Sequence, residues 1–173
     1  MSDKGTFPRQ DTLGFCLLEL AAICGEFPAS LLSRIPGSSS YKEAVITSLK
    51  KEGLLRVFYK DRLRGFRLGR KAKGRLLAEN PDRFAFYLTG DTDTNRIRSE
   101  VTRRLRLHRA AETYAAMLNA GAAVFRDEKP PVFLPEAVPV PVLKTPAFYG
   151  SREIKEMGID MVKIRSSRMI GVL

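Results

Sequence analysis

The sequence predicts a mainly α fold with a small β component, of the α+β class. Apolar residues recur at helical spacing through most of the first half of the chain. Two short runs rich in β-branched and aromatic residues interrupt that pattern at 54–60 and 63–68. A second long helical pattern follows at 95–121, and six of the ten prolines then lie between residues 129 and 146. A chain of 173 residues is long enough for one such domain with an additional arm.

Capping residues and apolar spacing predict the first two helices. Asp11 or Thr12 can cap a helix that runs to about residue 24, where Gly25 ends it. Pro28 suits the first turn of a second, short helix, which the Pro-Gly pair at 36–37 stops. Residues 1–8 are expected to be a flexible N-terminus. Apolar residues recur along the first helix at spacings of three and four and form one face, which comprises Leu13, Leu17, Leu20 and Cys24.

A third helix is predicted to begin near Ser40, which forms a capping box with Glu43, and to end at Gly53. Its phase predicts a buried face and an exposed, basic face. The buried face would comprise Tyr41, Ala44, Val45, Ser48 and Leu49. The exposed face would comprise Ser39, Lys42, Ile46, Thr47 and Lys50.

A β-hairpin and a fourth helix complete the first domain. Residues 54–60 and 63–68 are predicted strands joined by a turn at Asp61 and Arg62. Residues 70–79 are predicted to be helical and to stop at the Asn-Pro pair at 80–81. The order helix, helix, helix, hairpin, helix is typical of a winged helix-turn-helix domain. We therefore predict such a domain at residues 9–80, with the hairpin as its wing.

The rest of the chain divides into three parts. Residues 81–94 are predicted to be a connector, in which 84–88 form a strand or a packing loop. Residues 95–121 are predicted to form one long helix with near-heptad apolar spacing, a candidate homodimer seam. Residues 122–173 are predicted to be a Pro-rich arm with a short helix from Ser151 and a strand-like end. The seam would comprise Ile97, Val101, Leu105, His108, Ala111 or Glu112, Ala115 and Leu118.

The residue inventory excludes several classes of protein. Two cysteines and a single histidine, His108, cannot form a zinc site, and no Gly-rich phosphate-binding loop is found, so no metal and no cofactor are expected. Glu153 and Lys155 form half of a nuclease signature, but on a predicted helix that separates them, so the protein is expected not to be an enzyme. No long apolar stretch and no apolar signal core are seen, so we expect a cytoplasmic protein without membrane contact.

The charge distribution predicts binding to double-stranded DNA. The formal net charge is +11, and residues 42–75 hold twelve basic residues against three acidic ones. The exposed face of the third helix would read bases in the major groove, while the wing and its flank would contact phosphates. The predicted wing and flank contacts are Lys60, Arg62, Arg64, Arg67, Arg70, Lys71 and Lys73.

A second basic block lies in the predicted long helix, where residues 96–109 hold six arginines. Its side chains point in several directions around a helix, so they cannot all touch one duplex. Some are expected to extend the DNA surface, and others to pair with acidic residues of a partner or of the C-terminal segment. The candidates are Arg96, Arg103, Arg104 and Arg106.

Short motifs add a family resemblance. The Phe-Arg-Leu motif at 66–68 and the Lys-Gly-Arg-Leu-Leu motif at 73–77 resemble the passage from wing to helix in winged-helix proteins. The segments 94–96, 103–112, 148–155 and 164–172 are similar to parts of replication-relaxation-type proteins, which plasmids and integrative conjugative elements of Gram-positive bacteria encode. The resemblance implies a DNA-binding factor and brings no catalytic residues. Members of that family usually continue past the segment that matches residues 171–173, which leaves open whether a C-terminal domain is missing.

These observations together predict a non-catalytic, homodimeric DNA-binding protein. It would act as an accessory or regulatory factor in the replication or transfer of a mobile genetic element. Two alternatives remain open: a winged-helix transcriptional repressor, and a protein that docks on a relaxase or a replication initiator.

Overall fold

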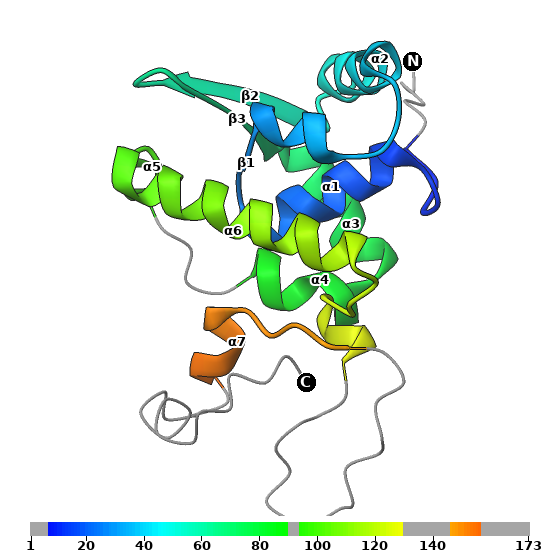
Figure 1. The fold of residues 1–173 in the computed structure, drawn as a ribbon, viewed down its shortest axis with the longest axis vertical. Helices are drawn as coiled ribbons and strands as arrows, with labels where there is room; N and C mark the ends of the chain where they lie inside the picture. Colours follow the sequence, from blue (N-terminus) through cyan, green and yellow to red (C-terminus); the bar gives the residue numbers. More distant parts are fainter. Residues whose placement is uncertain (1–6, 90–93, 130–145, 157–173) are drawn as a thin grey trace, which may run out of the picture. The chain divides into compact units, whose positions relative to one another are not determined.

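Helices and a small three-stranded antiparallel sheet make up the structure, a computed structural model that describes residues 7–89, 94–129 and 146–156 (Figure 1). The predicted α+β class is therefore confirmed. The chain divides into two compact units, Met1–Ala115 and Ala116–Leu173. Unit 1 extends well past residue 80, where we expected its domain to end. Most of the predicted N-terminal tail and Pro-rich arm, and the strand-like C-terminal end, lie outside the described residues.

Unit 1 is built around helix α1, Leu13–Cys24. The side-chain oxygen of Thr12 accepts a hydrogen bond from the Phe15 amide at 3.3 Å, and Gly25 ends the helix with a φ of +78°. The expected apolar face is only part of what is buried, because Phe15, Leu18 and their neighbours are also shielded from solvent. A helix that is apolar all round belongs in the centre of a core, and α1 contacts α2, α4 and β3.

The next segment differs from the prediction in two details. The short strand β1, Phe27–Pro28, precedes a 3₁₀ helix, η1, Ala29–Arg34, where a second α-helix was expected. Helix α2, Ser39–Lys51, is capped by Ser38, so the predicted capping box at Ser40 is wrong by two residues. The buried side chains of α2 are Lys42, Ile46 and Leu49.

The predicted hairpin is present. Strands β2, Leu55–Lys60, and β3, Leu63–Leu68, pair with each other, and β1 pairs with the other edge of β3, so the strand order is β1-β3-β2. Asp61 and Arg62 form the turn with φ values of +52° and +60°. Both values lie in the left-handed region that a two-residue type I′ turn requires. Helix α3, Arg70–Glu79, follows as predicted.

The connector and the long helix were predicted incorrectly. Residues 81–88 form helix α4, Pro81–Leu88, because Asn80 caps it and the Pro at its first position is compatible with a helix start. The expected single helix is interrupted after residue 98 and gives α5, Asn95–Arg98, and α6, Val101–Asn119. The predicted end of that helix is confirmed, since Gly121 adopts a φ of +74°.

Unit 2 contains the end of α6, a 3₁₀ turn η2, Arg126–Glu128, and helix α7, Ser151–Glu156, near the predicted position. An isolated parallel bridge joins Ala123 to Ala147. None of the described helices is both long and apolar enough to cross a membrane.

Candidate nucleic-acid interface

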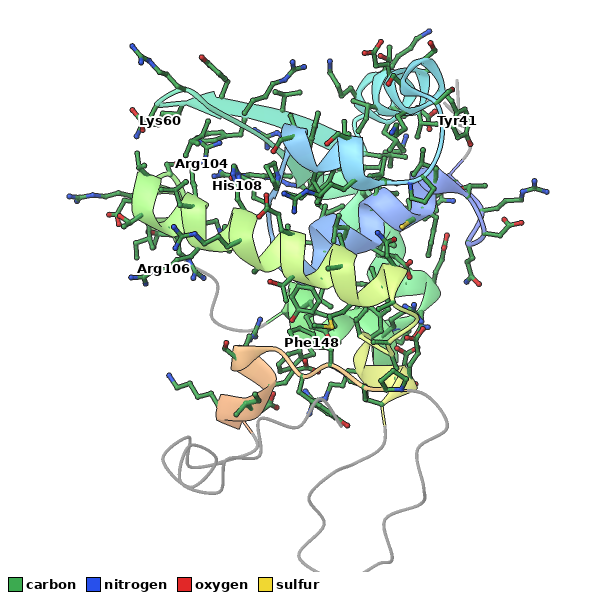
Figure 2. The ribbon with its side chains drawn as sticks, viewed as in Figure 1. Tyr41, Lys60, Arg104, Arg106, His108 and Phe148 are labelled. Atoms are coloured by element: carbon green, nitrogen blue, oxygen red, sulfur yellow. The ribbon has the colours of Figure 1, made fainter. Side chains whose placement is uncertain are left out.

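A buried ionic cluster supports the β2–β3 hairpin from one side. At its centre is Glu26, whose side chain is inaccessible to solvent. Arg67 Nε donates to Glu26 Oε2 at 2.6 Å, and Arg104 Nη2 donates to Oε1 at 2.7 Å. His108 Nε2 lies 2.7 Å from the same Oε1. The cluster therefore joins the start of β1, strand β3 and helix α6, and Figure 2 shows Arg104 and His108 between the hairpin and α6.

Arg104 also binds the main chain of the hairpin next to its turn. Its guanidinium donates to the carbonyl oxygens of Lys60 at 2.8 Å, Leu63 at 3.0 Å and Phe58 at 3.2 Å. A guanidinium presents its N–H donors in a fixed plane, and with the Glu26 contacts all three guanidinium nitrogens of Arg104 have a hydrogen-bond acceptor. The left-handed turn is thus held on both flanks, which compensates for the backbone strain at its two non-glycine residues.

Close packing on Phe58 and Gly65 constrains the cluster. The Phe58 ring lies 3.8 Å from the Arg67 guanidinium carbon and 4.7 Å from that of Arg104, as cation–π contacts. Gly65 faces Glu26, and a Cβ atom at position 65 would clash with the Glu26 carboxylate. The hairpin is therefore a preorganised element with a defined position on unit 1.

The electrostatics of the cluster lower the pKa of Glu26. Burial alone would raise this pKa, but hydrogen bonds from His108, Arg104 and Arg67, together with the Arg67 charge, outweigh burial and lower it to about 2. A depressed carboxyl pKa stabilises the folded state above the unfolded pKa, and that contribution is lost as pH falls through the folded value.

We therefore expect the wild-type protein to lose about 3 kcal/mol of unfolding free energy as pH falls from about 4.5 to about 2. Glu26→Gln removes the titrating carboxyl, so this variant should be less stable near neutrality and should show a much flatter acid dependence. Urea unfolding at a series of pH values measures both quantities. A parallel loss in both proteins would show that other carboxyls cause the acid sensitivity.

The structure corrects four of the predicted contact residues. Lys42 is only 7 % exposed and Ile46 only 6 %, so neither lies on the outer face of α2. Lys42 buries its aliphatic stem while its Nζ donates to the Ile35 carbonyl oxygen at 3.0 Å. Arg67 and Arg104 both bind Glu26, and the Arg104 side chain is fully buried. These four side chains are structural in this fold.

The other predicted side chains are accessible, apart from the half-buried Arg103. The outermost stripe of α2 is rotated from the predicted one and comprises Ser40, Ala44, Thr47 and Lys51. Figure 2 shows Tyr41 on α2 and Lys60 at the end of the hairpin, both along the upper edge of unit 1. The exposed predicted residues are Ser39, Thr47, Lys50, Lys60, Arg62, Arg64, Arg70, Lys71, Lys73, Arg96 and Arg106.

Several residues at this surface were not among the predicted ones. Lys51 and Arg56 are exposed cations, and a closer reading of charge along the sequence would have found both. Tyr59 is the most exposed large hydrophobic residue in the described part of the chain, at 67 %. Glu26 has no sequence signal, because its partner Arg104 lies 78 positions away.

The exposed cations of α2, the hairpin and the start of α3 have no acidic partner among the described residues. In the described part of the chain, no carboxylate forms an ion pair with any member of one exposed set. That set comprises Lys50, Lys51, Arg56, Lys60, Arg62, Arg64, Arg70, Lys71 and Lys73. We call these nine residues the cationic set.

Unit 2 has a buried pair of its own. Lys129 Nζ donates to Glu153 and to the Phe148 carbonyl oxygen, and the Gly150 amide donates to the other Glu153 oxygen at 2.8 Å. Burial lowers the pKa of Lys129, and its contact with Glu153 opposes that shift. Glu153 is therefore occupied, while Lys155, the other half of the nuclease-like pair, is exposed on the same short helix. The buried Lys129–Glu153 pair anchors α7.

Comparisons with protein-family models, with curated proteins and with solved structures found no match to this chain. The resemblance to replication-relaxation-type proteins therefore stays a prediction.

Proposed function

We propose that the helices and hairpin of residues 9–80, as part of unit 1, form a winged helix-turn-helix that binds double-stranded DNA without catalysis. The observation that supports this most is the cationic set, which is exposed and has no acidic partner within residues 7–89, 94–129 and 146–156. A duplex carries about one negative charge per 1.7 Å of its axis, and unneutralised Lys and Arg gain affinity by releasing the counterions of the phosphates. The order of the elements and the strand order β1-β3-β2 agree with a winged domain.

Helix α2 and the hairpin would contact different parts of the DNA. Helix α2 would enter the major groove with its outer stripe, Ser40, Ala44, Thr47 and Lys51, toward the base edges. The hairpin would act as a wing, with Lys60, Arg62 and Arg64 on phosphates. Because the ionic cluster holds the hairpin in place, little conformational entropy would be lost on binding.

The biological setting that we propose rests on the sequence resemblance. The protein would be an accessory or regulatory factor in the replication or transfer of a mobile element. One observation also favours a protein contact, either between two copies or with a relaxase or replication initiator. The first part of the expected seam is exposed: Ile97, Val101 and Leu105 recur every four residues and are 38–42 % exposed. The second part, at His108, Ala111 and Ala115, is buried within the chain. Light scattering, which gives the mass in solution, tests the homodimer.

Fluorescence anisotropy tests DNA binding directly. The full chain is titrated into labelled duplexes from its own genetic neighbourhood and into random duplex, at several salt concentrations. We expect preference for one neighbourhood site and a steep fall of affinity with salt. Weak binding that is equal on every duplex and insensitive to salt would contradict the proposal and favour protein docking.

Thr47→Val tests whether α2 reads the bases. It removes the hydroxyl of the one predicted recognition residue that also lies on the observed outer stripe, and it keeps the side-chain shape. We expect the preference for the best site over single-base variants to fall by about tenfold, with little change on random duplex. Lys42→Met, at a buried position, should lower thermal stability while it leaves the preference unchanged. Equal losses on all duplexes for Thr47→Val would exclude α2 as the reading helix.

A further inference from the structure

Tyr59 lies on the hairpin without a role in the fold. Its side chain is 67 % exposed, and among the residues that the structure describes neither its ring nor its hydroxyl forms a ring contact or a hydrogen bond. The hydrophobic effect would favour burial of a ring of this size. Tyr59 nevertheless lies exposed on β2, an edge strand of the sheet. The fold therefore does not explain the aromatic residue at this position.

The face around Tyr59 combines apolar and cationic groups. Tyr59 is directly opposite Arg64 in the antiparallel register, and Val57 precedes it on the same face with 37 % exposure. The Arg64 guanidinium lies 6.0 Å from the centre of the Phe66 ring, also on this face. An exposed ring is thus paired across the strands with Arg64, and Arg62 follows in the turn; neither arginine has an ion pair among the described residues.

This face is opposite to the ionic cluster. Residues that alternate along a strand point to opposite sides, so Phe58 faces Arg104 while Tyr59 faces away from it. The hydrogen bonds of Arg104 to the carbonyl oxygens of Phe58 and Lys60 flank Tyr59 directly. The backbone that carries the ring is therefore held rigidly, and only two side-chain torsions remain to be ordered on binding.

An exposed aromatic ring beside arginines indicates which chemical class of ligand this face would bind. Within a duplex, base faces are covered by their neighbours, and only edges and backbone are accessible to a wing. An unpaired base exposes its π-face, and aromatic side chains in cationic grooves stack on such bases. The arginines would neutralise the phosphates on either side of the stacked base.

We propose that Tyr59 stacks on an unpaired base, so that the preferred ligand is a duplex that adjoins a single-stranded segment. This inference rests on the proposed DNA binding and deepens it. The other members of the cationic set hold the paired region, and the Val57–Tyr59–Arg64 face holds the first unpaired nucleotide. Such a ligand occurs wherever DNA is opened or nicked.

The test compares a blunt duplex with the same duplex extended by an unpaired tail, with wild type, Tyr59→Ala and Tyr59→Phe. We expect wild type to bind the tailed duplex about tenfold more tightly than the blunt one. Tyr59→Ala should lose that preference and keep its affinity for blunt duplex, and Tyr59→Phe should retain the preference. Thermal melting of the variants confirms that this exposed position does not affect folding.

A second readout reports on stacking itself. The chain has no tryptophan, so Tyr59→Trp introduces a single tryptophan at the proposed contact, and its fluorescence can be excited apart from that of the remaining tyrosines. Its emission should be quenched by the tailed duplex and much less by the blunt one.

The outcomes separate this inference from the proposed function. Equal, salt-dependent binding of both ligands by wild type and Tyr59→Ala overturns the stacking contact while DNA binding stands. If Tyr59→Phe loses as much as Tyr59→Ala, the hydroxyl contacts a phosphate and stacking is excluded. No binding to either ligand overturns both proposals.

Discussion

Arg104→Met is expected to lower the free energy of unfolding of unit 1 by about 3–5 kcal/mol, the usual range when one partner of a buried charged pair is removed. Methionine keeps a helix-compatible stem of similar length in α6. It leaves Glu26 and the carbonyl oxygens of Phe58, Lys60 and Leu63 without this donor. Thermal unfolding followed by circular dichroism should show a midpoint about 10–20 °C lower for a unit of this size.

The matched control is Arg106→Met, two residues further along the same helix at an exposed position. It removes the same charge and should change the midpoint only slightly. A double-mutant cycle with Glu26→Gln adds a specific readout, because residues in contact show a coupling energy that separate sites lack. If Arg104→Met and Arg106→Met unfold alike, the cluster does not stabilise the hairpin.

The combined variant Lys60→Ala, Arg62→Ala, Arg64→Ala is expected to give the largest change in DNA binding. Each phosphate contact contributes about 0.9 to the slope of log affinity against log salt, so removing three should flatten the slope by about three. Affinity should fall to a similar extent on every duplex sequence, because phosphate contacts carry no sequence information. Anisotropy titrations at several salt concentrations measure both quantities. Alanine at position 62 retains the left-handed strain of arginine, so the turn itself is little altered.

A control variant removes the same total charge away from the hairpin, at Arg34, Arg109 and Lys155, all of which are exposed. It should retain most of the salt slope of the wild type. If the control flattens the slope as much as the hairpin variant, net charge alone would explain the affinity. The hairpin would then not be the wing of a DNA-binding domain.

Local signals were sufficient for most of the elements of unit 1. Helix α1 follows from its Thr12 cap and from Gly25, and the hairpin follows from two β-rich runs and the turn at Asp61 and Arg62. Such signals act between residues about four positions apart, so they can be identified in the sequence. Helix α4 was missed because a short apolar run is equally compatible with a strand and a helix.

The candidate site was only partly predictable for the same reason. The amount of positive charge and its location at 42–75 follow from the sequence, and most of those cations are exposed as expected. The orientation of α2 did not follow, because Tyr41 and Ala44 were expected in the core, whereas Lys42 and Ile46 are buried there.

Composition, charge, the α+β class and the hairpin with its basic turn were determined by the sequence alone. Only the tertiary structure decided which arginines face solvent and which support the hairpin. Arg104 and Arg106 look equivalent in a helical pattern, yet one is buried against Glu26 and the other is exposed. Glu26 lies 78 positions before Arg104 in the sequence. Folding brings its buried carboxylate close to α6, and that carboxylate determines which guanidinium is buried.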